Sequence, residues 1–177
     1  LPPAMRKVLE SEHGIKVEGE LCPLCEWKLT APVSEGGWGG DPRKAGIARI
    51  VLSEAKRLGI GTFVPSDPKG QDISELIGSI DLATIGTYGG ESDPRAYRFD
   101  GELQRANRGV MELIEIMKLD QKFLYTLIPV AQERQVKAPK HPLISVDLAV
   151  ISHTNEAEFN EFMGQPKNEA LRDRMHI

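Results

Sequence analysis

The chain contains four small groups of side chains that could bind a metal ion, a proton or a phosphate. They are the thiols of Cys22 and Cys25, the carboxylates of Glu112 and Glu115, the amide of Asn155, and the guanidinium groups of Arg172 and Arg174. Two acidic residues at the end of a buried strand can hold Mg²⁺ and orient an attacking water molecule. An amide can donate and accept a hydrogen bond at once. A guanidinium group can stabilise negative charge on phosphates.

The carboxylates and the amide also have structural interpretations. Glu112 and Glu115 are spaced i, i+3, so they could be solvated residues on one exposed helix face. Asn155 lies in Thr-Asn-Glu-Ala-Glu-Phe, a pattern typical of a helix start, and could cap a helix that begins near Glu156. The capping role and a role in chemistry do not exclude each other.

The two arginines flank Asp173 in Asn-Glu-Ala-Leu-Arg-Asp-Arg-Met. They could instead pair with Glu169 and Asp173 on a solvated helix face, an arrangement that contributes little to stability. The sequence leaves both interpretations of Arg172 and Arg174 open.

Cys22-Pro-Leu-Cys25 has a spacing that lets two thiolates bind one zinc ion. A structural zinc needs four ligands, and no second Cys-x-x-Cys occurs in the sequence. His13, nine residues upstream, is a candidate third ligand. A redox pair and simply packed or unpaired thiols are the alternatives.

The elements that must position these side chains follow from the spacing of apolar residues and from Gly and Pro. The patterns predict helices over 4–13, 71–80, 101–107, 119–132, 159–163 and 168–174, strands over 15–20, 48–52 and 146–153, and irregular segments over 30–46 and 59–69. Residues 146–153 form the clearest buried strand. Residues 109–117 fit a helix by periodicity, although their length and β-branched content allow a buried strand. The alternation of strands and helices predicts an α/β fold with a mostly parallel sheet.

Composition excludes several classes of protein. The 177 residues have 40% hydrophobic and 27% charged residues, as expected for a globular protein, and a formal net charge of -4 argues against nucleic-acid binding. The apolar runs are too short to span a bilayer, so we expect no membrane partner. No signal segment opens the chain, so we expect a cytoplasmic protein.

The last third of the chain resembles the second half of an AAA+ ATPase core. The resemblance lies in Phe-Asp-Gly-Glu-Leu-Gln-Arg-Ala-Asn-Arg-Gly at 99–109, Val-Met-Glu-Leu-Ile-Glu at 110–115, Ala-Val-Ile-Ser-His-Thr-Asn-Glu at 149–156 and Asn-Glu-Ala-Leu-Arg-Asp-Arg-Met at 168–175. With Gly-Ile-Gly-Thr-Phe at 59–63 and Gln-Asp-Ile-Ser-Glu-Leu-Ile-Gly-Ser-Ile-Asp at 71–81, the whole chain resembles the bacterial PrkA-type serine protein kinases.

The resemblance implies a role for each candidate residue. Residues 109–117 become a Walker B strand, in which Glu115 is the catalytic glutamate. The preceding position, normally Asp, is Ile114, which cannot bind a metal, so Glu112 is a possible substitute ligand. Asn155 would be the sensor residue that contacts the attacking water or the terminal phosphate. Arg174, with Arg172 as second choice, would be an arginine finger that acts on a neighbouring subunit.

The resemblance also implies ATP and Mg²⁺ as cofactors, a protein substrate and a homo-oligomer formed through the arginine-finger face. A Walker A loop of the form Gly-x-x-x-x-Gly-Lys-Ser/Thr is absent from the sequence. Because of this absence, and because the chain opens at Leu1, we expect a fragment of an AAA+ core.

Residues 1–58 are then expected to be an insert or subdomain that carries the Cys pair, and residues 59–177 the second half of the core. The expected function is ATP binding and hydrolysis coupled to protein phosphorylation or remodelling. The alternatives are an ATP-dependent protease or remodelling ATPase, or a non-catalytic interaction module that contains zinc.

Overall fold

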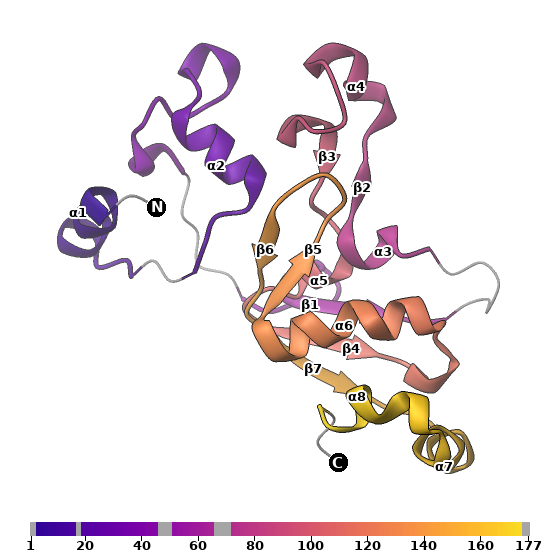
Figure 1. Ribbon diagram of the computed structural model, residues 1–177. Coiled ribbons are helices and arrows are strands. Elements are labelled where there is room, and N and C mark those ends of the chain that lie inside the picture. The colour runs from indigo at the N-terminus through magenta and orange to yellow at the C-terminus, as the bar shows by residue number, and fades with distance from the viewer. Residues whose placement is uncertain (1–2, 17–18, 46–50, 66–71, 175–177) are drawn as a thin grey trace.

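A three-stranded parallel sheet forms the centre of the protein in the computed structural model, which describes residues 3–16, 19–45, 51–65 and 72–174. Its strands are β1 (Ile60–Phe63), β4 (Val110–Leu113) and β7 (Ala149–Ser152), in the order β1-β4-β7 (Figure 1). The α/β fold with a parallel sheet is therefore confirmed.

The remaining elements surround this sheet. Two short antiparallel pairs are formed by β2 (Ser79–Ile80) with β3 (Tyr97–Arg98) and by β5 (Gln135–Lys137) with β6 (Leu143–Ser145). The α-helices are α1 (Pro3–His13), α2 (Pro23–Thr30), α3 (Ser74–Ile77), α4 (Leu82–Tyr88), α5 (Glu102–Arg105), α6 (Gln121–Glu133), α7 (Glu156–Gly164) and α8 (Glu169–Arg172). The 3-10 helices are η1 (Val33–Glu35), η2 (Pro42–Ala45), η3 (Pro94–Ala96), η4 (Ile116–Lys118) and η5 (Pro166–Asn168).

Helix α6 packs against one face of the sheet and forms most of the core there. Its apolar residues recur at helical spacing, and four of them are buried: Phe123, Leu124, Leu127 and Val130. The ring of Phe123 lies 5.3 Å from that of Phe63 in β1, beside the fully buried Met111 and Leu113 of β4. The helix therefore packs on β1 and β4, and its Leu124 and Leu127 line a cavity together with Val150 of β7.

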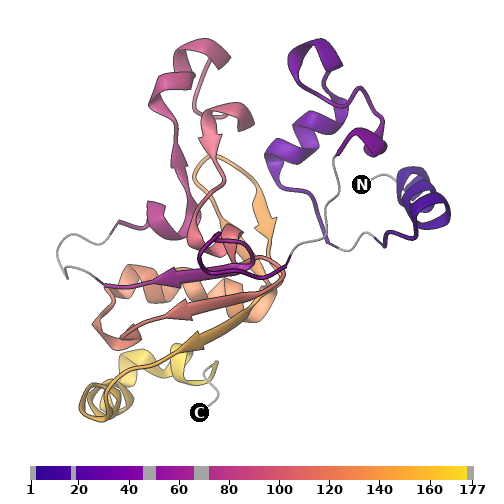
Figure 2. The ribbon, with the colours of Figure 1, turned by 180° about the vertical axis from the view of Figure 1, so that it is seen from behind.

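The opposite face of the sheet carries no helix among the residues that the structure describes (Figure 2). Thr62, Glu112 and Ile151 are paired in register on neighbouring strands and therefore share this face. Ile151 is 60% exposed. The protein thus has one covered and one open sheet face.

Strand β7 forms one edge of the sheet, and all four of its residues are exposed. The sequence predicted a buried strand over 146–153, and the burial is wrong. An apolar run fits a strand whose two faces are both covered by helices, whereas no described helix covers the Ile151 face and Val150 on the other face is 39% exposed.

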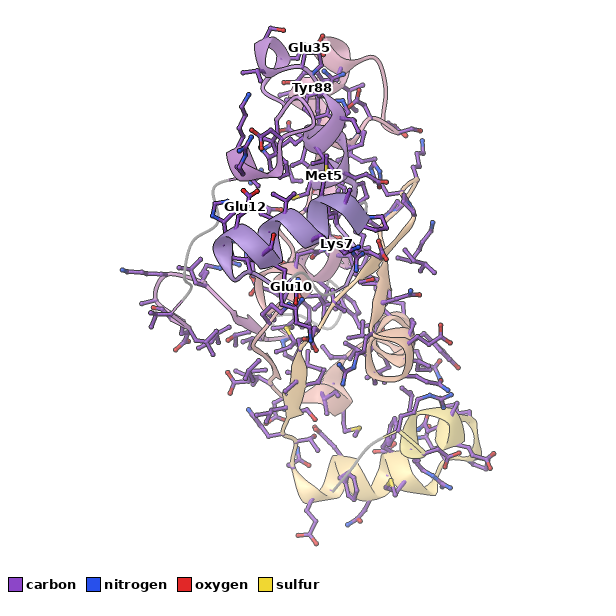
Figure 3. The ribbon with its side chains drawn as sticks, turned by 90° about the vertical axis from the view of Figure 1, so that its left-hand side faces the viewer. Met5, Lys7, Glu10, Glu12, Glu35 and Tyr88 are labelled. Carbon is purple, nitrogen blue, oxygen red and sulfur yellow. The ribbon has the colours of Figure 1, made fainter. Side chains whose placement is uncertain are left out.

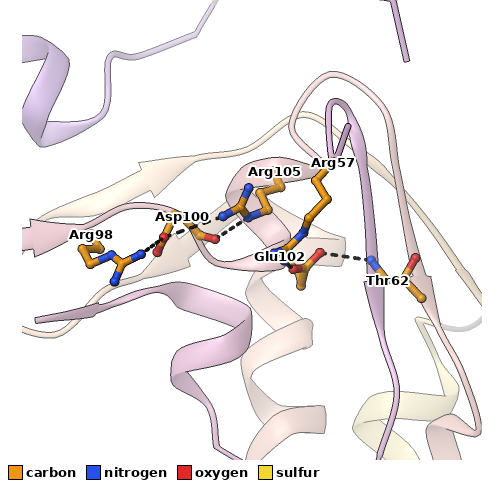
Figure 4. Close-up of polar contacts among 6 residues, drawn as sticks. All are labelled: Arg57, Thr62, Arg98, Asp100, Glu102 and Arg105. Carbon is orange, nitrogen blue, oxygen red and sulfur yellow. Dashed lines mark hydrogen bonds and ion pairs between the residues drawn. The ribbon is translucent and has the colours of Figure 1, made fainter. Parts of the chain in front are cut away.

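The other edge, at β1, is covered by α5. The buried carboxylate of Glu102 accepts a hydrogen bond from the Thr62 backbone N–H at 3.2 Å and forms an ion pair with Arg57 (Figure 4). Beside it, Asp100 pairs with Arg98 at 3.0 Å and with Arg105 at 3.7 Å. This edge of the sheet is closed by side chains of the chain itself.

The N-terminal segment with α1 and α2 contacts the rest of the protein at Arg95 and through Cys22, which packs against the main core. The Arg95 guanidinium lies 4.6 Å from the centre of the Trp27 ring and 4.4 Å from that of Tyr88, and it is held by Asp93. Figure 3 shows Tyr88 at the same end of the molecule as Glu35, while Lys7 and Glu10 project into solvent from α1. The division into domains at residue 58 stays a prediction.

Several predicted elements are wrong or only partly right. Helices were correctly expected over 4–13, 101–107, 119–132, 159–163 and 168–174. The described residues of 71–80 form α3 and β2 instead of one helix, and the described residues of 59–69 include β1. The described residues of 15–20 form no strand, and the strand predicted over 48–52 lies mostly outside the described residues. Helix α2, helix α4 and the β5–β6 pair were not predicted. No helix that the structure describes is long and apolar enough to cross a membrane.

Candidate nucleotide-hydrolysis site

The candidate site lies where β4 and β7 end. Hydrogen bonds between the two segments continue past the strands, because the His153 N–H donates to the Leu113 carbonyl at 3.2 Å and the Ile116 N–H donates to the His153 carbonyl at 3.1 Å. Parallel strands present their carboxyl ends at the same edge of a sheet. These bonds therefore bring Glu115 and the segment leading to Asn155 to one end of the sheet.

Glu115 occupies an unusual backbone conformation directly after β4. Its φ and ψ are both 51°, in the left-handed region that non-glycine residues rarely adopt. Its Oε2 atom is buried without a hydrogen bond and lies 3.4 Å from the Lys118 ammonium group. Strained backbone and an unsatisfied buried carboxylate oxygen are both more common at functional sites than elsewhere.

Lys118 connects Glu115 to the start of α7. Its ammonium group also lies 3.8 Å from the Glu158 carboxylate, whose second oxygen accepts a hydrogen bond from the Thr154 hydroxyl at 3.2 Å. Lys118, Thr154 and Glu158 are not among the functional residues that the sequence predicts. Their spacing, with Lys118 three residues after Glu115 and Glu158 three after Asn155, does not by itself indicate that Lys118 contacts Glu158.

Asn155 is the N-cap of α7. Its Oδ1 accepts a hydrogen bond from the Glu158 backbone N–H at 2.9 Å, so the capping interpretation is confirmed. The cap uses the oxygen of the exposed amide. The NH₂ group is the part of the side chain that could donate to a water or phosphate oxygen.

Glu112 lies within β4, on the open face of the sheet. The Thr62 hydroxyl of β1 is 3.5 Å from its carboxylate. At the position where the resemblance expects Asp, the Ile114 N–H continues the ladder to the Phe63 carbonyl at 3.0 Å. No group of three or more His, Cys, Asp or Glu residues in the described part of the chain lies close enough to hold a metal ion.

The two arginines have different environments. Arg172 is half-buried and donates to the Met163 carbonyl at 2.9 Å, which fixes α8 against α7. Arg174 is also half-buried and donates to the Gln132 side chain of α6 at 2.7 and 3.0 Å. It also lines a cavity of about 200 Å³ beside Val150 of β7. Arg174 also donates to the Ala170 carbonyl, so both guanidinium groups are bound by the chain itself.

The thiols of Cys22 and Cys25 lie at the start of α2. Cys22 is the N-cap, and its sulfur accepts a hydrogen bond from the Cys25 backbone N–H at 3.4 Å. The described residues supply neither His13 nor another side chain as a third metal ligand here. The zinc site predicted from the spacing is thus not assembled by the part of the chain that the structure describes.

Comparison with known proteins assigns the chain to a family. The family model described as the PrkA AAA domain matches residues 1–177. The chain belongs to the PrkA AAA domain family. It is 50% identical over its whole length to the ATP-dependent protease PrkA of Bacillus subtilis, of which it covers 27%. It is 31% identical over 97% of its length to the serine/threonine kinase YeaG of Escherichia coli K12, of which it covers 26%.

A solved structure agrees with the fold. The structure of NtrX from Brucella abortus matches 69% of this chain and 26% of its own with a TM-score of 0.50 and 19% sequence identity. At this identity the match concerns the fold alone. The family model and the curated relatives confirm the resemblance to PrkA-type proteins, whereas the roles of individual residues stay predictions. This PrkA AAA chain spans about a quarter of the length of the curated relatives it matches.

Proposed function

We propose that residues 1–177 supply the water-activating half of an ATP-hydrolysing site in a longer AAA+ protein. The observation that carries this proposal is the meeting of Glu115 and the Asn155 segment at the carboxyl ends of two hydrogen-bonded parallel strands. Ligands of open α/β sheets bind outside the carboxyl ends of the strands.

Glu115 would orient the attacking water and accept its proton, and the ion pair with Lys118 holds its carboxylate at the strand end. The amide NH₂ of Asn155 would donate to the same water or to the terminal phosphate. Oε2 of Glu115 is buried and accepts no hydrogen bond, although the Lys118 ammonium group lies 3.4 Å away, so it can still accept one from a bound water or ligand.

Mg²⁺ is commonly held by one or two carboxylates together with substrate phosphates. Glu115, or Glu112 as the substitute for the missing Asp, would contribute to such a site. When bound, the ion would neutralise charge on the phosphates of ATP. The Gly-Lys-Ser/Thr loop that binds these phosphates is not part of the sequence of residues 1–177.

The open edge at β7 and the open sheet face support the proposal that further segments of the longer protein complete the site. Ile151 is 60% exposed and Val150 39% exposed, next to the strand ends that carry the candidate residues. A strand with an unpaired edge can pair with another strand.

ATP hydrolysis would be coupled to action on a protein substrate. The 31% identical relative named as a serine/threonine kinase supports phosphorylation, and the 50% identical relative named as an ATP-dependent protease supports proteolysis or remodelling. Both outputs need the same ATP site. We further propose a homo-oligomer in which Arg174 reaches the ATP of a neighbouring subunit, because its guanidinium is partly exposed and is held by neutral acceptors, the Gln132 side chain and the Ala170 carbonyl.

Mixing two inactive variants of the full-length protein tests the proposal. Arg174→Ala alone should keep ATP binding and lose turnover, since such an arginine contributes roughly 10³–10⁵ in rate. A mixture of Arg174→Ala and Glu115→Gln subunits should recover part of the activity, because some interfaces then join the intact Arg174 of one subunit to the intact Glu115 of its neighbour. Arg174→Lys should rescue poorly, since an ammonium group cannot reproduce the planar fork.

Arg134→Ala is the matched control, because Arg134 is an exposed arginine that pairs with Asp147 at 3.0 Å. It should leave turnover unchanged. A monomeric full-length protein with full activity after Arg174→Ala, or mixing that recovers nothing, would contradict the arginine role.

A further inference from the structure

The Cys22-Pro-Leu-Cys25 motif is not used by the proposed ATP site. Cys22 is the N-cap of α2, Pro23 is the first helical residue, and Cys25 lies one turn into the helix. The Cys25 backbone N–H donates to the Cys22 sulfur at 3.4 Å. The helix start thus places two free thiols on one turn of backbone, with the sulfur of the first directed toward the second residue.

The surroundings make the two thiols unequal. A hydrogen bond from the Cys25 thiol, supported by the backbone N–H bonds of the helix start, lowers the pKa of Cys22 to about 6 even though partial burial acts in the opposite direction. The same hydrogen bond, together with burial, raises the pKa of Cys25. Lys28 adds a smaller lowering effect on both. A thiolate beside a protonated thiol is the arrangement of a nucleophile and its resolving partner.

We propose that Cys22 and Cys25 form a redox-active dithiol that a peroxide oxidises to an intramolecular disulfide. In the first step the Cys22 thiolate attacks one oxygen of hydrogen peroxide, the O–O bond breaks, and Cys22 sulfenic acid and hydroxide form. In the second step the Cys25 sulfur attacks the Cys22 sulfur, the S–O bond breaks, and the hydroxyl leaves as water with the Cys25 proton. The hydroxide takes up a proton, so two thiols and one peroxide give one disulfide and two waters.

The position of the pair makes this chemistry accessible and gives it a structural consequence. Both cysteines are partly exposed, so a small oxidant reaches them. Cys22 also packs against the main core, and the helix it caps carries Trp27, which stacks on Arg95. Disulfide formation would replace the thiolate cap of the helix that joins the N-terminal segment to the rest of the protein.

Peroxide treatment of the reduced full-length protein tests the dithiol directly. The protein is reduced, freed of reductant without oxygen, exposed to hydrogen peroxide and then labelled with N-ethylmaleimide. Trypsin cleaves after Lys16 and Lys28, so both cysteines are on the single peptide 17–28. We expect this peptide to lose two hydrogens and to carry no label after peroxide, and to carry two labels after dithiothreitol. A peptide that keeps two labels after peroxide would overturn the proposal.

Two variants separate the roles of the thiols. In Cys25→Ala the resolving thiol is gone, so Cys22 should accumulate sulfenic and then sulfinic acid. In Cys22→Ala, Cys25 should stay reduced and accept one label. Equal oxidation of the remaining thiol in both variants would contradict the assignment. One zinc ion per chain that protects both thiols from peroxide in the wild-type protein would also overturn the dithiol in favour of a metal site.

Discussion

The two edges of the central sheet are built differently. At β1 the edge is closed, because α5 lies against the strand and the Glu102 carboxylate accepts the Thr62 N–H that a neighbouring strand would otherwise bind. At β7 the edge is open, and Val150 and Ile151 are 39% and 60% exposed. One edge terminates the sheet and the other can still extend it.

Backbone geometry at β7 supports this difference. The N–H groups of Ala149 and His153 donate to the carbonyls of Gly109 and Leu113 beside β4. Because the direction of backbone groups alternates along a strand, the N–H groups of residues 150 and 152 point away from β4. The comparison supports the proposal that further strands of a longer protein pair on the β7 side, next to the candidate ATP site, rather than past β1.

The largest loss of stability should come from Gly61→Ala, at the closed edge of the sheet. A Cβ at position 61 would clash with the Glu102 carbonyl oxygen and crowd the Met111 sulfur at 3.0 Å. Overpacking of this kind costs up to about 3 kcal/mol, so the free energy of unfolding should fall by about that amount in urea titrations of the 177-residue chain.

Gly86→Ala is the matched control, because Gly86 lies in α4 with open space around it. It should raise stability by up to about 1 kcal/mol through helix propensity. If both substitutions change the free energy of unfolding equally, α5 does not pack closely against β1.

Glu102→Ala should have the next largest effect. It leaves the Thr62 N–H without its acceptor and Arg57 without its carboxylate partner, at a cost of about 2 kcal/mol. Glu102→Gln keeps an acceptor oxygen and should lose less in the same urea titration. If Glu102→Ala unfolds at the wild-type midpoint, the β1 edge is not closed by this carboxylate.

The smallest effect in the 177-residue chain should be that of Ile151→Asp at the open edge. Ile151 is exposed, and an Asp at this position would lie opposite Glu112 and add a small repulsion, so stability should fall by less than about 1 kcal/mol. In the full-length protein the same substitution should be costly, because a covered Ile contributes about 1.5–3 kcal/mol. Thermal unfolding of both forms measures the difference.

Leu82→Asp, at a 79% exposed position in α4, is the control and should change the stability of both forms only slightly. If Ile151→Asp changes the stability of both proteins only slightly, the Ile151 face of β7 is solvent-exposed in the full-length protein as well.

The sequence predicted the helices better than the strands. The 3.6-residue period of apolar residues was sufficient to predict α6, because the helix buries the one face on which these residues lie. Strand β1 was missed because Gly59 and Gly61 resemble loop punctuation, whereas Gly61 is needed for the close approach of Glu102. In 109–117 the apolar spacing fits a helix, and only the resemblance to PrkA-type proteins predicted the strand that β4 forms.

The candidate site was predictable in part. The helix cap at Asn155 follows from local sequence, and it is present. The contact of Lys118 with both Glu115 and Glu158 was not predictable, because it depends on the left-handed turn at Glu115, and no residue type in Leu-Ile-Glu-Ile-Met indicates that turn. Local sequence patterns predict helix caps and helical periodicity. They do not predict turns that depend on hydrogen bonds between distant segments, such as the bond from the Ile116 N–H to the His153 carbonyl.

The most direct measurement compares ATP hydrolysis and ATP binding by the full-length protein with Glu115→Gln and with Glu112→Gln. If Glu115 is the base at the end of β4, Glu115→Gln should bind ATP with wild-type affinity and lose turnover by roughly 10²–10⁴, the usual contribution of a general base. Wild-type turnover in Glu115→Gln together with loss of turnover in Glu112→Gln would contradict the account and would place the catalytic carboxylate on the open face of the sheet, beside Thr62.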